Sequence, residues 1–162
     1  MTNNSTVGID FSLTSPAVCI HDGLTWSVDN CHFFFVTPDS RKAGVWSEDA
    51  AIKLEGGGFS KEDAASPEER FDTLASILMD FIESRIICCA DVAIEDYAFG
   101  ARGRVFHIGE ACGILKNKLY SRGYKFETFA PAAVKKSATG KGNANKDAMA
   151  AAFFEETGIR MK

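Results

Sequence analysis

Two acidic residues, each at the end of an apolar segment, are the side chains of this sequence best suited to chemistry. Asp10 closes TVGID and Glu95 closes VAIE, and each segment is short and apolar enough for a buried strand. If the two strands are neighbours, both carboxylates converge at one edge of a sheet. Two hard oxygen ligands suit Mg²⁺ or Mn²⁺, ions that keep water and bind phosphate oxygens. The pair therefore predicts metal-assisted hydrolysis of a phosphodiester, in which the ion activates water and stabilises the leaving oxygen.

The two acids are not equally strong evidence for a metal site. An Asp at the end of a strand is most often a turn residue, so Asp10 alone predicts little. Glu95 is more informative, because a charged group on a buried strand normally needs a partner.

A loop of aromatic, glycine and arginine residues follows the second acid at positions 97–104. Aromatic rings stack on bases or wedge between them, while Arg side chains reach phosphates. An ordinary surface loop with Phe99 turned inward is the alternative. The residues expected to contact DNA are Tyr97, Phe99, Arg102 and Arg104.

A second basic segment lies nearer the end of the chain. Lys135, Lys141 and Lys146 accompany a loop that contains Gly140 and Gly142, a set that could clamp a nucleic-acid backbone. The loop lacks the leading glycine that a Walker A sequence requires at this spacing, so nucleotide binding is disfavoured.

The distribution of charge favours an anionic partner although the net charge of −4 does not. Residues 98–162 contain 12 Lys and Arg against 5 Asp and Glu, a local +7. Residues 1–97 contain the remaining 6 against 17, a local −11. One part of the chain is therefore suited to phosphates while the other stays solvated.

Length and composition describe a single globular domain over residues 1–162. The chain is 46% hydrophobic and 25% charged, values of an ordinary soluble protein. No apolar run approaches the roughly 20 residues of a membrane span, and the start of the chain is not a secretory signal. We expect a cytoplasmic protein without membrane contact. Its cysteines are odd in number and form no CxxC pair, so free thiols are expected at Cys19, Cys31, Cys88, Cys89 and Cys112.

The elements that must position the two acids begin with an antiparallel meander. Apolar segments predict strands at 6–12, 17–21, 24–28 and 31–36, with a hairpin signal at Asp22-Gly23. The glycine-rich stretch 37–66 reads as a long connection without regular structure. Later strands are expected at 92–94 and 124–129, between helices, and this order predicts an α/β fold with a mixed sheet.

The predicted helices are marked by their ends and by their periodicity. Ser66, Pro67 and Glu69 form a start signal for a helix that runs to about Arg85. A helix at 105–121 has its buried face at Val105, Ile108, Cys112, Leu115 and Leu119. Gly109 and Gly113 on that helix permit close approach of another element, either the sheet or a second copy of the chain. Shorter helices are expected at 131–138 and 146–156.

At these residues the sequence resembles the RuvC family of Holliday junction resolvases. The likeness lies in an ordered set of motifs: VGIDFSLTSPAVCI at 7–20, VAIEDYAFG at 92–100, FHIGEACGILKNKL at 106–119, and FAPAAVKKSATGKGNANKDAM at 129–149. The resemblance implies an RNase H-like fold with a mixed five-stranded sheet flanked by helices. It also implies a homodimer formed through the helix at 105–121, and Mg²⁺-dependent nicking of a four-way DNA junction.

The resemblance assigns roles to individual residues. Asp10 and Glu95 match the metal-binding carboxylates, and Tyr97 or Phe99 lies where the family has its junction-probing aromatic. Lys135 and Lys146 match lysines that the family uses on DNA and near the scissile phosphate. The insert and the long aromatic loop fit the divergent members found in bacterial phages.

One departure from the family concerns the end of the chain. The family completes its metal site with an acidic pair on a final helix, and this sequence ends at Lys162 before that helix begins. The alternative to a nuclease is therefore a non-catalytic, junction-binding protein with an incomplete metal site. Two further readings are a related nuclease acting on other branched DNA or RNA–DNA hybrids, and a sugar-kinase-like ATPase. The last is disfavoured, because no phosphate-binding glycine pattern follows the first strand.

Overall fold

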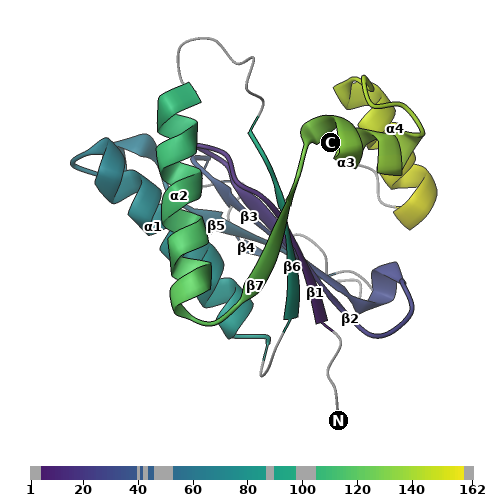
Figure 1. The fold of residues 1–162 in the computed structure, drawn as a ribbon, viewed down its shortest axis with the longest axis horizontal. Helices are drawn as coiled ribbons and strands as arrows, with labels where there is room; N and C mark the ends of the chain where they lie inside the picture. Colours follow the sequence, from purple (N-terminus) through teal and green to yellow (C-terminus); the bar gives the residue numbers. More distant parts are fainter. Residues whose placement is uncertain are drawn as a thin grey trace.

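A single mixed β-sheet, flanked by helices on both faces, organises the chain (Figure 1). The computed structural model describes residues 5–39, 41, 44–45, 53–86, 90–97 and 105–158. The strands are β1 (Ser5–Asp10), β2 (Ala17–Asp22), β3 (Cys31–Thr37), β4 (Gly44–Val45), β5 (Lys53–Gly58), β6 (Ala90–Glu95) and β7 (Lys125–Phe129). The α-helices are α1 (Pro67–Glu83), α2 (Val105–Ser121), α3 (Pro131–Thr139) and α4 (Lys146–Thr157).

The strands lie in the order β4-β5-β3-β2-β1-β6-β7, and most of them point the same way. Strand β1 is parallel to β6 and β6 is parallel to β7, while β2 is antiparallel to both β1 and β3. Strand β5 is parallel to β3. The carboxyl ends of β1, β3, β5, β6 and β7 therefore lie at one edge of the sheet, which we call the carboxyl edge.

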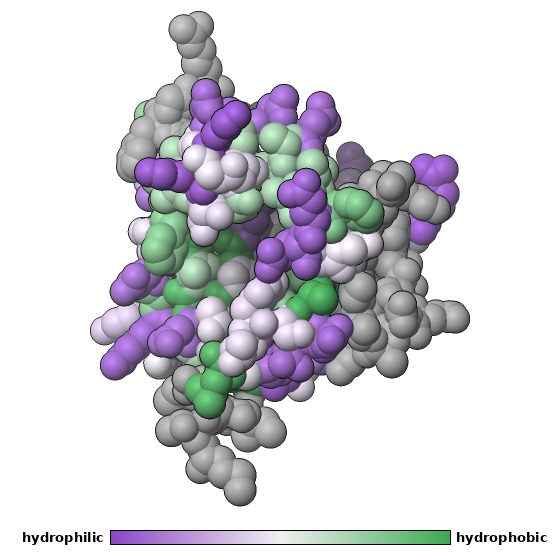
Figure 2. Space-filling model, turned by 90° about the vertical axis from the view of Figure 1, so that its right-hand side faces the viewer, coloured by the Kyte–Doolittle hydropathy of each residue, from purple (hydrophilic) through white to green (hydrophobic). Residues whose placement is uncertain are grey.

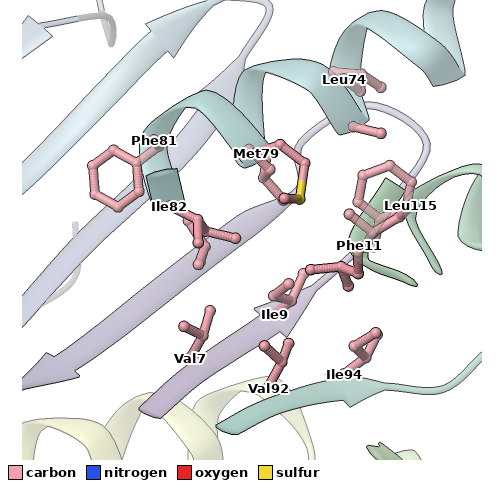
Figure 3. Close-up of a cluster of buried hydrophobic side chains, with 14 of the residues drawn as sticks. Val7, Ile9, Phe11, Leu74, Met79, Phe81, Ile82, Val92, Ile94 and Leu115 are labelled. Carbon is pink, nitrogen blue, oxygen red and sulfur yellow. The ribbon is translucent and has the colours of Figure 1, made fainter. Parts of the chain in front are cut away.

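One face of the sheet is covered by α1 and α2 and carries the hydrophobic core. Burial alternates along β1 and β6, so that Val7 and Ile9 point to this face together with Val92 and Ile94. They meet buried side chains of the two helices, including Leu115 of α2, as Figure 3 shows. The core thus fixes the two central strands side by side.

The opposite face of the sheet is approached by α4. Phe153 of α4 packs edge-on against Phe33 of β3, with ring centroids 5.9 Å apart. The indole nitrogen of Trp26 donates a 2.6 Å hydrogen bond to the carboxylate of Glu156. In Figure 1, α3 and α4 accordingly lie on the other side of the sheet from α1 and α2.

The predicted α/β class, with a mixed sheet between helices, is confirmed, but the strand count differs. The described residues form seven strands rather than five, because the stretch 37–66 contributes β4, β5 and a short 3-10 helix, Lys61–Asp63. The prediction of an irregular connection there was wrong for this part. The three consecutive glycines of β5 gave no strand signal in the sequence. Gly57 leaves room for the Phe34 ring of the neighbouring strand, because a Cβ atom at this position would lie 2.8 Å from that ring.

The predicted strand at 24–28 was also wrong. Strand β2 ends at Asp22, and after a bend the chain enters a 3-10 helix, Val28–Asn30, before β3 begins. The hydroxyl of Ser27 caps this short helix by accepting from the amide of Asp29 at 3.3 Å. The local capping bond therefore overrides the apolar pattern, and Leu24 remains 86% exposed.

The start of α1 follows the predicted signal. The hydroxyl of Ser66 accepts a hydrogen bond from the amide of Glu69 at 3.2 Å, and Pro67 is the first helical residue. The carboxylate of Glu69 accepts from the amide of Ala65 at 2.7 Å. Among the described residues, no helix is long and apolar enough to cross a membrane. The same part of the chain holds free thiols at Cys19, Cys31 and Cys112, while Cys88 and Cys89 lie outside it.

Candidate active site at the carboxyl edge of the sheet

Asp10 and Glu95 are the last residues of two adjacent parallel strands. Ile9 of β1 is in register with Ile94 of β6, so the two acids follow at the same level of the sheet. Both residues alternate with buried core residues and therefore project from the face opposite the core. Their placement at one edge agrees with the expectation from the sequence.

The electrostatics of the pair confirm their proximity. Partial burial raises the pKa of Asp10 above its ordinary value of 3.8. Burial also raises the pKa of Glu95, and the negative charge of Asp10 raises it further. Asp10 is exposed as a whole residue, although neighbouring atoms displace part of the water around its carboxyl group. Two carboxylates that repel each other at a site partly shielded from water favour the binding of a proton or a cation between them.

The positive charge of Lys135 acts on one member of this pair, Glu95. Its charge lowers the pKa of Glu95, opposing the two causes that raise it. The lysine is positioned by α3, which begins two residues after β7 reaches the carboxyl edge, with Pro131 as its first residue. The lysine side chain is half-buried. The topology thus joins three residues that are far apart in sequence.

Lys141 lies on the connection between α3 and α4, Lys146 is the first residue of α4, and both are exposed. Gly140 ends α3 in the left-handed conformation, at a φ of 75°. Asn145 caps α4 by accepting from the amide of Ala148 at 2.9 Å. Within the described residues neither lysine forms an ion pair with a carboxylate, so both charges face solvent. Figure 2 looks onto this side of the molecule, where hydrophilic residues surround scattered hydrophobic ones.

The aromatic loop is only partly covered by the structure. Tyr97 is half-buried and packs against the core, and a Cβ atom at Gly109 of α2 would lie 3.9 Å from its ring and hydroxyl. Gly109 therefore accommodates Tyr97 and belongs to intramolecular packing. Phe99, Arg102 and Arg104 lie outside the described residues.

Asp96 is an acid of this edge that the sequence interpretation did not assign. It follows Glu95 and so points to the core-side face, where its carboxylate lies 3.8 Å from the Lys116 ammonium of α2. Its amide donates to the carbonyl of Phe129 at 2.8 Å, which ties β6 to the end of β7. The charges of Asp96 and Asp10 contribute to the raised pKa of the Cys112 thiol, after burial as the main cause. The only sequence signal was its position beside Glu95.

One surface of α2 carries a stripe of largely exposed residues, in which Glu110 lies 3.2 Å from the ring of His107. Phe106 and Tyr120 are 84% and 78% exposed, and no described side chain lies within 4 Å of the Cβ position of Gly113. The stripe has the alternating spacing of four and three residues that places side chains on one helix face. Its members are Phe106, Glu110, Gly113, Asn117 and Tyr120.

Stability should fall with rising pH through the two carboxyl groups when chelator removes divalent ions. Their pKa values are raised in the folded state, so the folded chain holds more protons than the unfolded chain in the interval above the ordinary values of 3.8 and 4.5. Their ionisation therefore destabilises the fold as pH rises through the folded pKa values. We expect Asp10→Asn to unfold at a higher temperature than the wild type at pH 7. Solvent screening limits the gain to about 1 kcal/mol or less.

Thermal unfolding of both proteins at pH 7 and pH 3 would measure this effect. The difference should disappear at pH 3, where Asp10 is protonated in both the folded and the unfolded wild type. A difference of equal size at both pH values would assign the gain to something other than ionisation.

The chain is similar to one protein family and to solved structures of one of its members. The family model described as "Crossover junction endodeoxyribonuclease RuvC" matches residues 38–154. The solved "Thermus thermophilus RuvC structure" aligns with 97% of this chain and 82% of its own, at 16% identity and a TM-score of 0.60. "T. thermophilus RuvC in complex with Holliday junction substrate" aligns with 98% and 82%, at 16% identity and a TM-score of 0.61. No curated protein matches the sequence. At this identity the solved structures establish a common fold.

Proposed function

Because the chain belongs to the RuvC family of crossover junction endodeoxyribonucleases, we propose that it hydrolyses DNA at four-way junctions with a divalent cation at Asp10 and Glu95. One observation carries the proposal: the two carboxylates end adjacent parallel strands at the carboxyl edge, where the charge of Asp10 adds to burial in raising the pKa of Glu95. The family match begins at residue 38, so Asp10 is assigned from this geometry and from the shared fold rather than from that match.

The residues present fit a hydrated divalent cation. The described residues contain no group of three or more His, Cys, Asp or Glu side chains placed to share a metal ion, so the protein ligands in this region are the two carboxylates. Mg²⁺ commonly binds through one or two carboxylates and completes its shell with water and phosphate oxygens. When bound here, the ion would supply activation of water and stabilisation of charge on the leaving oxygen. The pKa values of both acids are raised because their ionised forms are disfavoured in the fold, and a bound cation would stabilise those ionised forms.

The basic residues of α3 and its following loop hold the DNA strand in this proposal. Lys135 is placed beside Glu95 and binds the phosphate next to the reacting one. Lys141 and Lys146 extend the positive surface along the exposed connection to α4. Lys146 is assigned to the charge that develops on the reacting phosphate, and Phe99, Arg102 and Arg104 to the junction itself.

The homodimer expected from the family uses the exposed stripe of α2. Phe106 and Tyr120 supply apolar area at its two ends, and Gly113 lets a second backbone approach closely. A two-fold axis through the stripe would present two carboxyl edges to the two strands that are cut in a junction.

Junction binding without cleavage is the second candidate function. The specific observation in its favour is the pair of carboxylates without a third metal ligand among the described residues. An assay with labelled four-way junction, nicked flap, RNA–DNA hybrid and linear duplex in Mg²⁺ or Mn²⁺ separates the candidates. Paired, symmetric nicks in the junction alone support the resolvase. Tight binding to the junction without nicks in either metal selects the binding protein.

Divalent cations should raise the thermal stability of the wild type. A ligand that binds only the folded state stabilises it by mass action, and at about 100 times its Kd the gain is roughly 2.7 kcal/mol. We expect Mg²⁺ or Mn²⁺ titrations to increase Tm in the wild type. The same titration should leave Asp10→Asn unchanged, because that variant has lost one of two carboxylates. An equal increase in both proteins would place the cation elsewhere.

A further inference from the structure

Arg70 lines a pocket that the proposed site does not use, with its guanidinium carbon 5.2 Å from the centroid of the adjacent Phe71 ring. Arg70, in the first turns of α1, forms no ion pair within the described residues, and its Nε atom is buried without a hydrogen-bond partner. A guanidinium group has five donors, and burying one unpaired is costly. Two other arginines show the contrast: Arg85 binds Glu55 at 2.5 Å and Arg122 binds Glu83 at 2.7 Å.

The pocket beside Arg70 has a volume of about 200 Å³ and is mainly apolar. Leu13, Phe59 and Leu74 supply apolar walls, and Leu74 is fully buried beneath it. Glu62 lies on the exposed side of the pocket and forms no ion pair with Arg70. The space is large enough for one sugar or one phosphate with part of its nucleotide, and too small for a longer segment.

The pocket opens at the same edge of the sheet as the two carboxylates. Its walls follow the carboxyl ends of strands: Leu13 comes after β1, Pro38 after β3 and Phe59 after β5. Leu13 is three residues from Asp10, which limits their separation along the chain to about 10 Å. Asp10 projects from one face of the sheet and α1 covers the other, so the pocket lies across the edge from the carboxylates.

We propose that Arg70 and this pocket bind a DNA strand one to a few nucleotides from the phosphate held at Asp10 and Glu95. The guanidinium group would bind a phosphate oxygen, and the apolar walls would contact the adjoining sugar. An anionic oxygen satisfies the donors that Arg70 leaves unpaired, and Arg suits phosphate because its planar donors bind two oxygens at once. The inference rests on the proposed function, and it adds a strand contact on the side of the edge away from the lysines of α3 and α4.

The test measures binding of a labelled four-way junction at several salt concentrations, with every protein in the Asp10→Asn background to suppress cleavage. Arg70→Gln should weaken binding about tenfold, because it removes a charge-assisted hydrogen bond. It should also reduce the slope of log K against log salt by about 0.9, the value for one phosphate. Arg122→Gln is the matched control: it changes net charge equally on an arginine already paired with Glu83, and should leave the slope unchanged.

A variant of opposite sign tests the same pocket without removing Arg70. Glu62→Gln takes a competing carboxylate away from the phosphate, so binding should tighten about two- to fivefold. This variant decides the question if Arg70→Gln fails to fold, as shown by circular dichroism and Tm.

The outcomes separate the inference from the function on which it rests. A parent protein that binds the junction, with Arg70→Gln or Glu62→Gln equal to it in affinity and slope, overturns the pocket and leaves the junction nuclease standing. A parent that binds no DNA overturns both. Equal losses in Arg70→Gln and Arg122→Gln would also overturn the pocket, because general charge would then explain the effect.

Discussion

Asp10→Asn should abolish cleavage of a four-way junction while leaving binding to it intact. The substitution preserves the size of the side chain but removes one of the two negative charges that would hold the cation in the proposed site. A metal that supplies about 4 kcal/mol of transition-state stabilisation is worth about 10³-fold in rate, so we expect a loss of at least that size. Binding should persist, because the phosphate contacts come from lysine and arginine side chains.

Asp91→Asn is the matched control for this prediction. Asp91 is exposed on β6 and projects from the same face as Glu95, but it lies near the opposite end of the strand. Its removal changes the net charge equally and should leave the rate of cleavage near that of the wild type. Single-turnover cleavage rates of the three proteins provide the measurement. Comparable rates for Asp10→Asn and the wild type would contradict the metal assignment.

Phe106→Glu should convert the proposed homodimer into monomers and prevent paired nicking. The exposed ring would be replaced by a carboxylate that must be buried unpaired in the interface, at a cost of at least about 3 kcal/mol. That cost weakens the dimer by at least about 100-fold. The monomer should remain folded, because the ring is 84% exposed and an acid near a helix N-terminus is favourable.

Leu24→Glu is the control for the dimer, since Leu24 is 86% exposed and lies in the bend after β2 rather than on α2. Analytical ultracentrifugation over a range of concentrations gives the dissociation constants, and the junction assay gives the ratio of paired to single nicks. Dissociation of Leu24→Glu to the same extent, or an undisturbed dimer in Phe106→Glu, would place the interface on another surface.

The convergence of the two acids could be predicted because it depends on local patterns. Each carboxylate ends a short apolar segment, and parallel neighbours bring such ends together. The start of α1 and the buried face of α2 were also readable, since capping and periodicity are properties of a few consecutive residues. Cys112, Leu115 and Leu119 are buried as the spacing of the helix at 105–121 predicts.

The features that escaped prediction are made by contacts between distant segments. Strand β5 has a poor intrinsic propensity, and its glycine is explained only by the Phe34 ring of β3. The ion pair of Asp96 with Lys116 joins the end of β6 to the fourth turn of α2, and no local pattern announces it. Arg70 follows the capping residues of α1, and no local pattern indicates its place beside a pocket. The phage-type origin remains a prediction that neither the fold nor the family match tests.

The way α3 and α4 are attached to the sheet has a consequence for local unfolding of the protein. Neither helix contains a fully buried residue, and the ring contact of Phe153 and the hydrogen bond of Glu156 tie α4 to the sheet. Elements with little buried apolar area separate from a fold at a low free energy and exchange their amide hydrogens early. The lysines thus belong to a unit that can detach by itself, while β1 and β6 stay closed until global unfolding. In the proposed function, the lysines of α3 and α4 would then adjust to a bent DNA strand without moving the paired acids.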